Sequence, residues 1–469
     1  MKRLAPLALL MLALSLIACN FSYIAPRATP IQTAQPTPSP RPVAAITPSP
    51  TPAASGQAAV PQVGVSFIRF YFYNTDPFQP ETIFQDFAAS GVQMYRHLVK
   101  ADLTWRNIEP LDNQWRFELA DSVIFDSPLP FIATLFDYSY TSGTPPWCTD
   151  SAEFQKTLGA EAQDYLDHVL ERYGPYVKYW ELGNEMEHWR AADPGDDGRG
   201  TETLPACVPP DGFSPEEQGR FLAQAAQYIR ERDPDAVIIM PGMIGVSGYS
   251  LDTWLAGVIE GGGSDWFDVV NYHYYGPWQR YPRLRADLTA FLLAHGIDDK
   301  PIWATETGTT SSPTLTERTD YPNSPEEQAA DVFRRIVAAW GAGDQLVLWH
   351  TYIGSPDNPQ NVWREYGLRE ADGSAKPALY SFRLLTAELV PFRQVEAIDI
   401  ERGGPNIYRI TTQEGVVKFV VWGEGTFTVP PNIGQMTEVV PDGAGHFAWQ
   451  SISPGQEITL TDTPRLLKP

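Results

Sequence analysis

The chain has 469 residues, 43% of them hydrophobic, and a formal net charge of −23. This length allows a large barrel with an added domain. The charge argues against a nucleic-acid partner, because nucleic acids are bound by basic patches that release phosphate counterions; it suits an exported protein with a neutral substrate. Aromatic residues make up 12% of the chain. Such rings stack on the apolar faces of sugars, although a large aromatic core accounts for most of them.

The first 19 residues have the form of a signal peptide. A basic start, Met1-Lys2-Arg3, precedes an apolar run from Leu4 to Ile17 that is too short to cross a membrane comfortably. The run ends in Leu16-Ile17-Ala18-Cys19, which resembles a bacterial lipobox. We therefore expect cleavage before Cys19, lipidation of that cysteine and display at the bacterial cell surface, with no other membrane contact. The alternatives are an ordinary signal peptide with a chance cysteine, which would leave the protein secreted, and, less favoured, an uncleaved anchor.

Residues 20–60 are expected to form a disordered linker. They contain Thr-Pro and Ser-Pro repeats, as at Thr37-Pro38-Ser39-Pro40, and no Asp or Glu. Such a segment cannot bury enough apolar surface to offset the entropy lost on ordering. Its prolines keep it extended, so we expect a stalk between the membrane and the folded part of the chain.

From residue 61 to residue 390, short apolar runs alternate with amphipathic segments. The apolar runs predict strands at residues 63–72, 93–97, 129–136, 177–182, 236–240, 267–272, 302–305 and 346–349. The amphipathic segments predict helices at residues 80–90, 151–173, 214–233, 252–260, 284–295, 324–341 and 376–389. Ser214 and Ser324 each precede a Pro and stand three residues before a Glu, which is the pattern of a capping box.

Eight strands alternating with helices predict an α/β fold, a (β/α)8 barrel. An open doubly wound sheet is the alternative, but that fold usually carries a Gly-rich phosphate-binding turn, and the sequence contains no G-x-G-x-x-G. After residue 390 the pattern changes to alternating runs such as Val416 to Trp422, separated by turns at Gly403-Gly404 and Asp442-Gly443. Residues 391–469 are therefore expected to form a small all-β sandwich. It would be either a structural domain packed on the barrel or a carbohydrate-binding module. We prefer the structural domain, because the sequence shows no exposed row of aromatic residues of the kind that binds sugars.

Polar and aromatic residues stand at the ends of the predicted strands, where a barrel of this kind carries its working residues. They are Arg96 after the second strand, Asp137 after the third, Asn184 and Glu185 after the fourth, His273 and Tyr275 after the sixth, Glu306 after the seventh and Trp349 in the eighth. Each has a structural alternative: Arg96 as a core ion pair, His273 as a barrel histidine, Trp349 as core packing. If all of these structural alternatives held, chance would have placed every one of these residues at the same end of the barrel. The set as a whole therefore favours a functional site.

Asp137 is the weakest of these candidates and could simply cap a loop. In order and spacing Asn184-Glu185, His273-x-Tyr275, Glu306 and Trp349 resemble the catalytic set of glycoside hydrolase clan A, the retaining (β/α)8-barrel glycosidases. Two further segments resemble its β-xylosidase and cellulase branches: residues 105–110, Trp-Arg-Asn-Ile-Glu-Pro, and residues 367–378 at the exit from the eighth strand. The resemblance covers residues 63–389. It implies a carbohydrate substrate, no cofactor and no metal, and we expect a monomer.

The resemblance also implies roles for single residues. Glu185 would be the acid/base and Glu306 the nucleophile of a double displacement, which needs two carboxyls about 5 Å apart. Arg96 and Tyr275 would keep Glu306 ionised. The remaining contacts to the sugar would come from Asn184 to its 2-hydroxyl, from Trp349 as a floor beneath it, and from His273.

Several features remain open at this stage. Glu181 and Glu187 flank Glu185 but lack a preceding Asn, so we prefer Glu185 to them as the acid/base. In an exported protein Cys148 and Cys207 are expected to form a disulfide. Trp147, Trp189 and Trp278 are candidate sugar platforms or loop supports. The sequence does not choose between hydrolysis, transglycosylation and glycan binding on an inactive scaffold, nor between xylosides, glucans and mannans, nor between exo and endo cleavage.

Overall fold

The computed structural model describes residues 60–69, 80–99, 103–136, 158–188, 214–312, 324–354, 365–400 and 404–469. The expected signal peptide and all but the last residue of the linker lie outside these ranges, and so do Cys19, Asp137, Trp147, Cys148, Trp189 and Cys207. Within the described residues, no helix combines the length and apolarity needed to cross a membrane.

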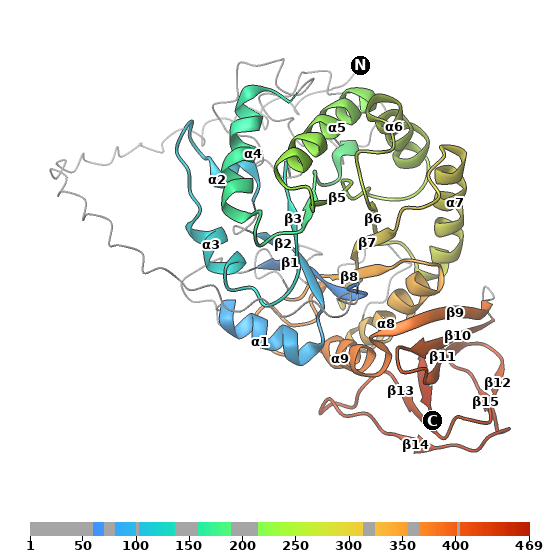
Figure 1. The fold of residues 1–469 in the computed structure, drawn as a ribbon. Helices are drawn as coiled ribbons and strands as arrows, with labels where there is room; N and C mark the ends of the chain where they lie inside the picture. Colours follow the sequence, from blue (N-terminus) through green and yellow to red (C-terminus); the bar gives the residue numbers. More distant parts are fainter. Residues whose placement is uncertain are drawn as a thin grey trace, which may run out of the picture. The chain divides into compact units, whose positions relative to one another are not determined.

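Eight parallel strands form the central sheet, in the order β5-β4-β3-β2-β1-β8-β7-β6. Bridges from Ile239 to Val269 and from Met243 to Tyr272 join β5 to β6 and close the sheet into a barrel. Helices surround the strands, as the ring in Figure 1 shows. The strands are β1 (Val63–Arg69), β2 (Met94–Val99), β3 (Phe131–Thr134), β4 (Tyr179–Glu181), β5 (Val237–Ile239), β6 (Val270–Tyr274), β7 (Ile302–Thr307) and β8 (Leu346–His350). The predicted (β/α)8 barrel is confirmed.

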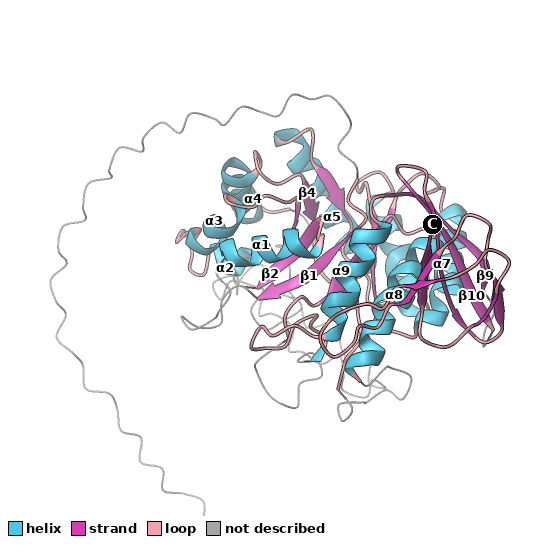
Figure 2. Cartoon of the chain, turned by 90° about the horizontal axis from the view of Figure 1, so that it is seen from below, coloured by secondary structure: helices cyan, strands magenta, loops and turns pink. Residues whose placement is uncertain are grey.

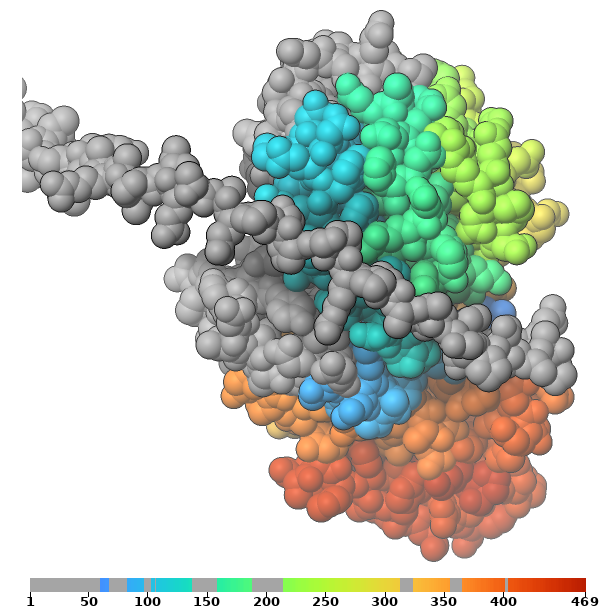
Figure 3. Space-filling model, turned by 60° about the vertical axis from the view of Figure 1, so that its left-hand side comes forward, coloured from blue at the N-terminus to red at the C-terminus, as the bar shows by residue number. Residues whose placement is uncertain are grey.

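The helical layer follows the predicted pattern, with local differences. Its α-helices are α1 (Pro80–Ser90), α2 (Trp105–Ile108), α3 (Glu118–Ile124), α4 (Ala160–Tyr173), α5 (Pro215–Arg232), α6 (Ala256–Gly262), α7 (Tyr281–Ala294), α8 (Pro325–Gly341) and α9 (Pro377–Leu389). Helices α2 and α3 were not predicted, because each is too short to show a helical period. The helix predicted at residues 252–260 begins earlier, with a π-helical segment, η3 (Tyr249–Leu255). Short 3-10 helices, η2 (Met186–His188) and η4 (Trp278–Arg280), complete the layer. Helices α4 and α5 lie side by side on the face seen in Figure 3.

Local chemistry explains where these helices start and stop. The Ser214 hydroxyl accepts a hydrogen bond from the Glu217 amide at 3.2 Å, and the Glu217 carboxylate accepts one from the Ser214 amide at 3.1 Å, so the predicted capping box is present. At α8 only half of the predicted box is present: the Ser324 hydroxyl accepts from the Glu327 amide at 3.1 Å, whereas the Glu327 carboxylate accepts from Arg334 at 3.0 Å. Gly91 ends α1 with φ at +67°, a conformation that suits glycine.

Inside the barrel, side chains alternate between the interior and the helical layer. A first interior layer is apolar and consists of Met94, Ile132, Ile239, Val269, Trp303, Leu346 and Leu348. Two residues further along the strands the interior turns polar, with Ser66, Arg96, Thr134, Glu181, Asn271, Thr305 and His350. The barrel is therefore closed below by an apolar plug and carries a buried polar layer at the carboxyl ends of its strands.

The C-terminal part forms a second, antiparallel unit of structure. Its six-stranded sheet has the order β14-β13-β16-β11-β10-β9, and β12 pairs with β15. The strands are β9 (Phe392–Ile400), β10 (Pro405–Thr412), β11 (Val417–Gly423), β12 (Thr426–Thr428), β13 (Gln435–Glu438), β14 (Gln450–Ser451), β15 (Glu457–Thr459) and β16 (Arg465–Lys468). Ile407, Phe419 and Val421 pack against Phe427 and Ile458 of the smaller sheet.

The opposite face of the six-stranded sheet packs on the barrel. Tyr408, Val420, Trp422 and Leu466 belong to the same apolar core as the barrel's helical layer. The Arg334 guanidinium on α8 donates to the Asp462 carbonyl at 2.7 and 3.1 Å. Helices α8 and α9 lie side by side between the barrel strands and β9 (Figure 2). The sandwich therefore shares a continuous apolar core with the barrel.

Candidate active site

The polar layer of the barrel is organised around Arg96. Its guanidinium is fully buried and donates to Glu181 from Nε at 2.6 Å and from Nη2 at 3.0 Å. The same Nη2 donates to Oδ1 of Asn184 at 2.8 Å, and Nη1 donates to Oε1 of Glu306 at 2.6 Å. Arg96 is thus both the core ion pair and the site residue that the sequence offered as alternatives. Planar guanidinium groups suit such bidentate pairing with carboxylates.

Glu181 is the buried counter-ion of Arg96, and it has a full set of partners. Besides Arg96, it accepts hydrogen bonds from Thr134 Oγ1 at 2.7 Å and from Asn271 Nδ2 at 2.6 Å. Thr305 Oγ1 donates to Oδ1 of Asn271 at 2.7 Å, which fixes the amide orientation. Because a buried charge is costly unless it is paired and hydrogen-bonded, these contacts assign Glu181 to the support of Arg96.

Glu306 lies among cations and donors. Tyr275 donates to its Oε2 at 2.5 Å, and the Nδ1 atoms of His273 and His350 lie 3.7 and 3.6 Å from the same oxygen. Burial alone would raise the pKa of the Glu306 carboxyl, but the charges of the two histidines and of Arg96, with the Tyr275 hydrogen bond, outweigh it and hold that pKa well below its usual range. The contacts expected from Arg96 and Tyr275 to Glu306 are both present.

A bulge in β7 turns Glu306 towards the interior. Trp303 and Thr305 face the barrel interior, so strict alternation would turn Glu306 outward. The pairing of β7 with β6 and β8 shifts register here: Glu306 pairs with His273, and Thr307 pairs with Trp349. A bulge of this kind re-aims one side chain, and bulges are frequent beside active sites.

Glu185 follows β4 at the end of a sharp turn. Its φ is +48°, unusual for a residue with a side chain, and its amide donates to the Gly242 carbonyl at 3.0 Å. Its Oε1 lies 2.7 Å from Nδ1 of His273. The Glu185 side chain is 22% exposed and the Glu306 side chain 11%. The strained turn therefore presents Glu185 at the more open side of the site.

His273 stands between the two glutamates. Burial would lower the pKa of its imidazole, but the charge of Glu306 and the hydrogen bond to Glu185 outweigh burial and raise it. A β-carbon added at Gly242 would lie only 2.1 Å from Nε2 of His273. The ring therefore packs directly on the backbone of the loop after β5, which fixes its position.

The separation of the two carboxyls can be bounded. One oxygen of Glu185, one oxygen of Glu306 and a ring nitrogen of His273 all lie within 4.8 Å of one another. This spacing would also admit a metal ion. However, both oxygens of Glu306 already accept hydrogen bonds, from Arg96 and Tyr275, and a cation there would be repelled by the guanidinium. The donor set suits an ionised carboxylate better than a metal ligand.

Trp349 corrects one sequence-based expectation. We expected it to form a floor beneath the sugar, but its side chain has no exposed surface and lies in the core of the helical layer, with Nε1 donating to the Tyr366 carbonyl at 3.2 Å. It alternates with Leu348 and therefore faces away from the barrel interior. The next residue, His350, faces inward: its Nδ1 lies 3.2 Å from Ser66 Oγ, and its ring contacts that of Tyr275 edge-on.

Sequence reasoning missed several residues of the polar layer: Ser66, Thr134, Asn271, Thr305 and His350. A signal was available, since each stands two positions after an interior apolar residue or glycine of its strand, at the carboxyl end.

Among the candidate sugar platforms, Trp278 is partly buried and packs edge-on against Trp422 of the sandwich, with ring centres 5.2 Å apart. It therefore supports its loop.

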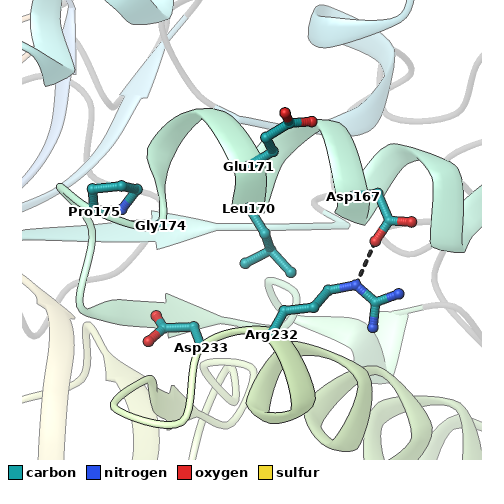
Figure 4. Close-up of a pocket in the computed structure, with 7 residues that line it drawn as sticks. All are labelled: Asp167, Leu170, Glu171, Gly174, Pro175, Arg232 and Asp233. Atoms are coloured by element: carbon teal, nitrogen blue, oxygen red, sulfur yellow. Dashed lines mark hydrogen bonds and ion pairs between the residues drawn. The ribbon is translucent and has the colours of Figure 1, made fainter.

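A separate hollow of about 610 Å³ lies between the carboxyl ends of α4 and α5. Its lining comprises Asp167, Leu170, Glu171, Gly174, Pro175, Arg232 and Asp233, and an ion pair joins Arg232 to Asp167 (Figure 4). These helix ends precede β4 and β5, so the hollow is at the amino-terminal end of the barrel. Barrel enzymes carry their sites at the other end.

No family model matches the sequence, and no curated protein matches it. Solved structures do share its fold. A family 39 glycoside hydrolase from the gut symbiont Bacteroides cellulosilyticus WH2 is 16% identical, with a TM-score of 0.61 over 87% of this chain and 80% of that one. A glucosidase from Croceicoccus marinus is 13% identical, with a TM-score of 0.57 over 86% of this chain and 94% of that one. A monomeric β-xylosidase from Caulobacter crescentus CB15 is 13% identical, with a TM-score of 0.52 over 87% of this chain and 96% of that one. The chain therefore has the barrel fold of these glycosidases, as its resemblance to clan A implied.

Proposed function

We propose that the protein is a retaining glycoside hydrolase that cleaves β-glycosidic bonds in oligosaccharides or polysaccharides. One observation carries the proposal: the two glutamates at the carboxyl ends of β4 and β7 approach within 4.8 Å and have different surroundings. Glu306 is held ionised by Arg96, Tyr275 and the two histidines, whereas Glu185 is more exposed and contacts His273. Retaining enzymes need carboxyls about 5–5.5 Å apart, in two distinct protonation states.

In the first step Glu306 attacks the anomeric carbon while Glu185 donates its proton to the departing glycosidic oxygen. This forms a glycosyl ester on Glu306 and releases the leaving group. In the second step Glu185 takes a proton from water, the water oxygen attacks the anomeric carbon, and Glu306 leaves as the carboxylate. His273 orients Glu185, and Asn184, held by Arg96, is placed to bind the 2-hydroxyl of the sugar.

The test is a panel of aryl β-glycosides and polysaccharides. The β-xyloside and β-glucoside come first, because the neighbouring structures are named as a β-xylosidase and a glucosidase. Glu306→Ala should abolish turnover, and a 2-deoxy-2-fluoro glycoside should label Glu306 in the wild type. Azide should restore turnover of an activated aryl glycoside by Glu185→Ala, whereas Glu260→Gln on the exposed side of α6 should behave as wild type.

Two alternatives would show themselves in the same experiment. A glycan-binding protein on an inactive scaffold would bind polysaccharide, while wild type and Glu306→Ala would be equally inert. A transglycosylase would form the labelled ester but transfer the sugar to an acceptor more rapidly than to water.

The remaining assignments concern the whole chain. We propose a lipoprotein signal peptide at residues 1–19, a stalk at 20–60, a catalytic barrel at 61–390 and a sandwich at 391–469, in a monomer anchored at the cell surface through Cys19. We also propose a disulfide between Cys148 and Cys207. Mass spectrometry of the membrane fraction checks the lipid and, without reduction, the disulfide. Light scattering of the soluble part checks the oligomeric state.

A further inference from the structure

A third carboxyl, that of Glu187, is buried beside the proposed catalytic pair. It lies in η2, two residues after Glu185, and is 4% exposed. Its Oε1 accepts a hydrogen bond from the Ile244 amide at 2.5 Å, which ties η2 to the loop after β5. Its Oε2 is buried and has no hydrogen-bond partner among the described residues.

Glu187 contrasts with Glu181, the other buried glutamate near the site. Glu181 has an arginine and two further donors, whereas no cation of the described chain forms an ion pair with Glu187. The ionisable groups that act on Glu187 are Glu185 and His273, and burial has the largest effect. Burial and the charge of Glu185 raise the pKa of Glu187 to about 7, against the opposing effects of its own amide, the Ile244 amide and His273.

A carboxyl of this kind is costly to the fold. A glutamine would have the same shape and could still accept from Ile244, without the penalty of a buried unpaired charge. Buried titratable groups with a specific charge partner are concentrated at functional sites. The effect of one acid on another is also reciprocal: if the charge of Glu185 disfavours ionisation of Glu187, ionised Glu187 disfavours ionisation of Glu185.

We infer that Glu187 is a positioning residue for the acid/base: a buried carboxyl fixed to the loop after β5, whose protonation state governs how strongly Glu185 holds its catalytic proton. This inference rests on the proposed role of Glu185. Below neutral pH Glu187 is protonated and neutral. As the pH rises Glu187 ionises, and its negative charge makes Glu185 keep its proton to a higher pH. The enzyme therefore retains activity further into the alkaline range than Glu185 alone would permit.

The experiment compares the full-length wild type with Glu187→Gln, using 4-nitrophenyl and 2,4-dinitrophenyl glycosides of the sugar that the panel identifies. For the 4-nitrophenyl substrate, whose leaving group needs a proton, the alkaline limb of kcat/KM should move to lower pH by about one unit in the variant. For the dinitrophenyl substrate, whose leaving group departs without a proton, kcat/KM should stay within about twofold of wild type. Glu260→Gln is the matched control, an exposed Glu→Gln change on α6.

A second measurement does not depend on activity. In the wild type the folded protein keeps a proton on Glu187 up to about pH 7, whereas the unfolded chain loses it near its ordinary pKa. The stability of the wild type relative to Glu187→Gln should therefore be greatest below about pH 4.5 and should fall up to pH 7, by about tenfold in the unfolding constant per pH unit. If Glu187→Gln does not fold, Glu187→Met serves in both measurements.

The outcomes separate the two proposals. If no substrate is turned over, the proposed function fails, and the stability profile alone decides whether Glu187 holds a proton. If the enzyme is active but the pH–rate profile and the stability profile of Glu187→Gln both coincide with those of the wild type, the inference fails and the proposed function stands. Equal losses on both substrates would reduce Glu187 to a structural role. Loss of activity rescued by azide would make Glu187 itself the acid/base, which also overturns the inference.

Discussion

Replacing Arg96 with Met removes the one cation that serves two buried carboxylates. Arg96 contacts Glu181 and Glu306 at 2.6 Å each and has no exposed surface. Removing one partner of a buried ion pair costs about 3–5 kcal/mol, because it leaves an unpaired charge away from water. Folded domains are stable by only about 5–15 kcal/mol, so this is a large fraction. We expect Arg96→Met to lower the free energy of unfolding by about that amount.

The double variant Arg96→Met/Glu181→Gln isolates the cause. The amide introduced by Glu181→Gln is neutral and can still accept from Thr134, so the double variant should recover about 2 kcal/mol or more relative to Arg96→Met. Activity should not recover, because Glu306 still lacks its guanidinium. We expect kcat/KM to remain about 10²–10³-fold below wild type in both variants.

Urea denaturation gives the stabilities, and the pH dependence of kcat/KM gives the effect on Glu306. The acid limb of that profile should move to higher pH in both variants, because a positive charge that lowers the pKa of Glu306 has been removed. Arg283→Met, which removes an exposed ion-pair partner of Asp287, is the control and should stay near wild type. A loss below about 1 kcal/mol in Arg96→Met, or a double variant no more stable than the single one, would refute the reasoning.

Three further changes test single contacts. Tyr275→Phe removes the donor to Oε2 of Glu306, so kcat/KM should fall by about 10–100-fold while the circular dichroism spectrum stays unchanged; an unaffected rate would remove Tyr275 from the site. His350→Gln takes away one positive charge that lowers the pKa of Glu306, so the acid limb of kcat/KM should move to higher pH. On acidification, the stability that ionised Glu306 contributes should also be lost at a higher pH than in the wild type. An acid limb at the wild-type pH would mean that the charge of His350 does not act on Glu306. Gly242→Ala places a methyl against Nε2 of His273, so kcat for substrates with poor leaving groups should fall more than for activated ones. Gly443→Ala, whose added β-carbon meets no atom within 4 Å and whose backbone is not left-handed, is the control for the loss of a glycine. Equal effects of Gly242→Ala on both substrates would mean that His273 does not act through Glu185.

Most of the fold could be predicted from the sequence, because each element depends on near neighbours. Helix α1 has its predicted bounds, and α5 its predicted capping box, since both rest on residues within one turn. The acid/base candidate Glu185 could also be predicted from the sequence, because it follows a short apolar strand and an Asn. Strand ends were less certain: β6 begins three residues after its predicted start, where apolar residues outside the strand extend the pattern.

The sequence alone determined the order of strands and helices. It also determined that two glutamates stand at strand ends and that polar residues follow two positions after the apolar plug. The tertiary structure decided which of them meet. It paired Arg96 with Glu181 as well as Glu306, and it placed His350 at the site instead of Trp349. It also turned Glu306 inward through a bulge that no alternation predicts. The physical reason is that strand pairing across the barrel sets the register, and register depends on residues far apart in sequence.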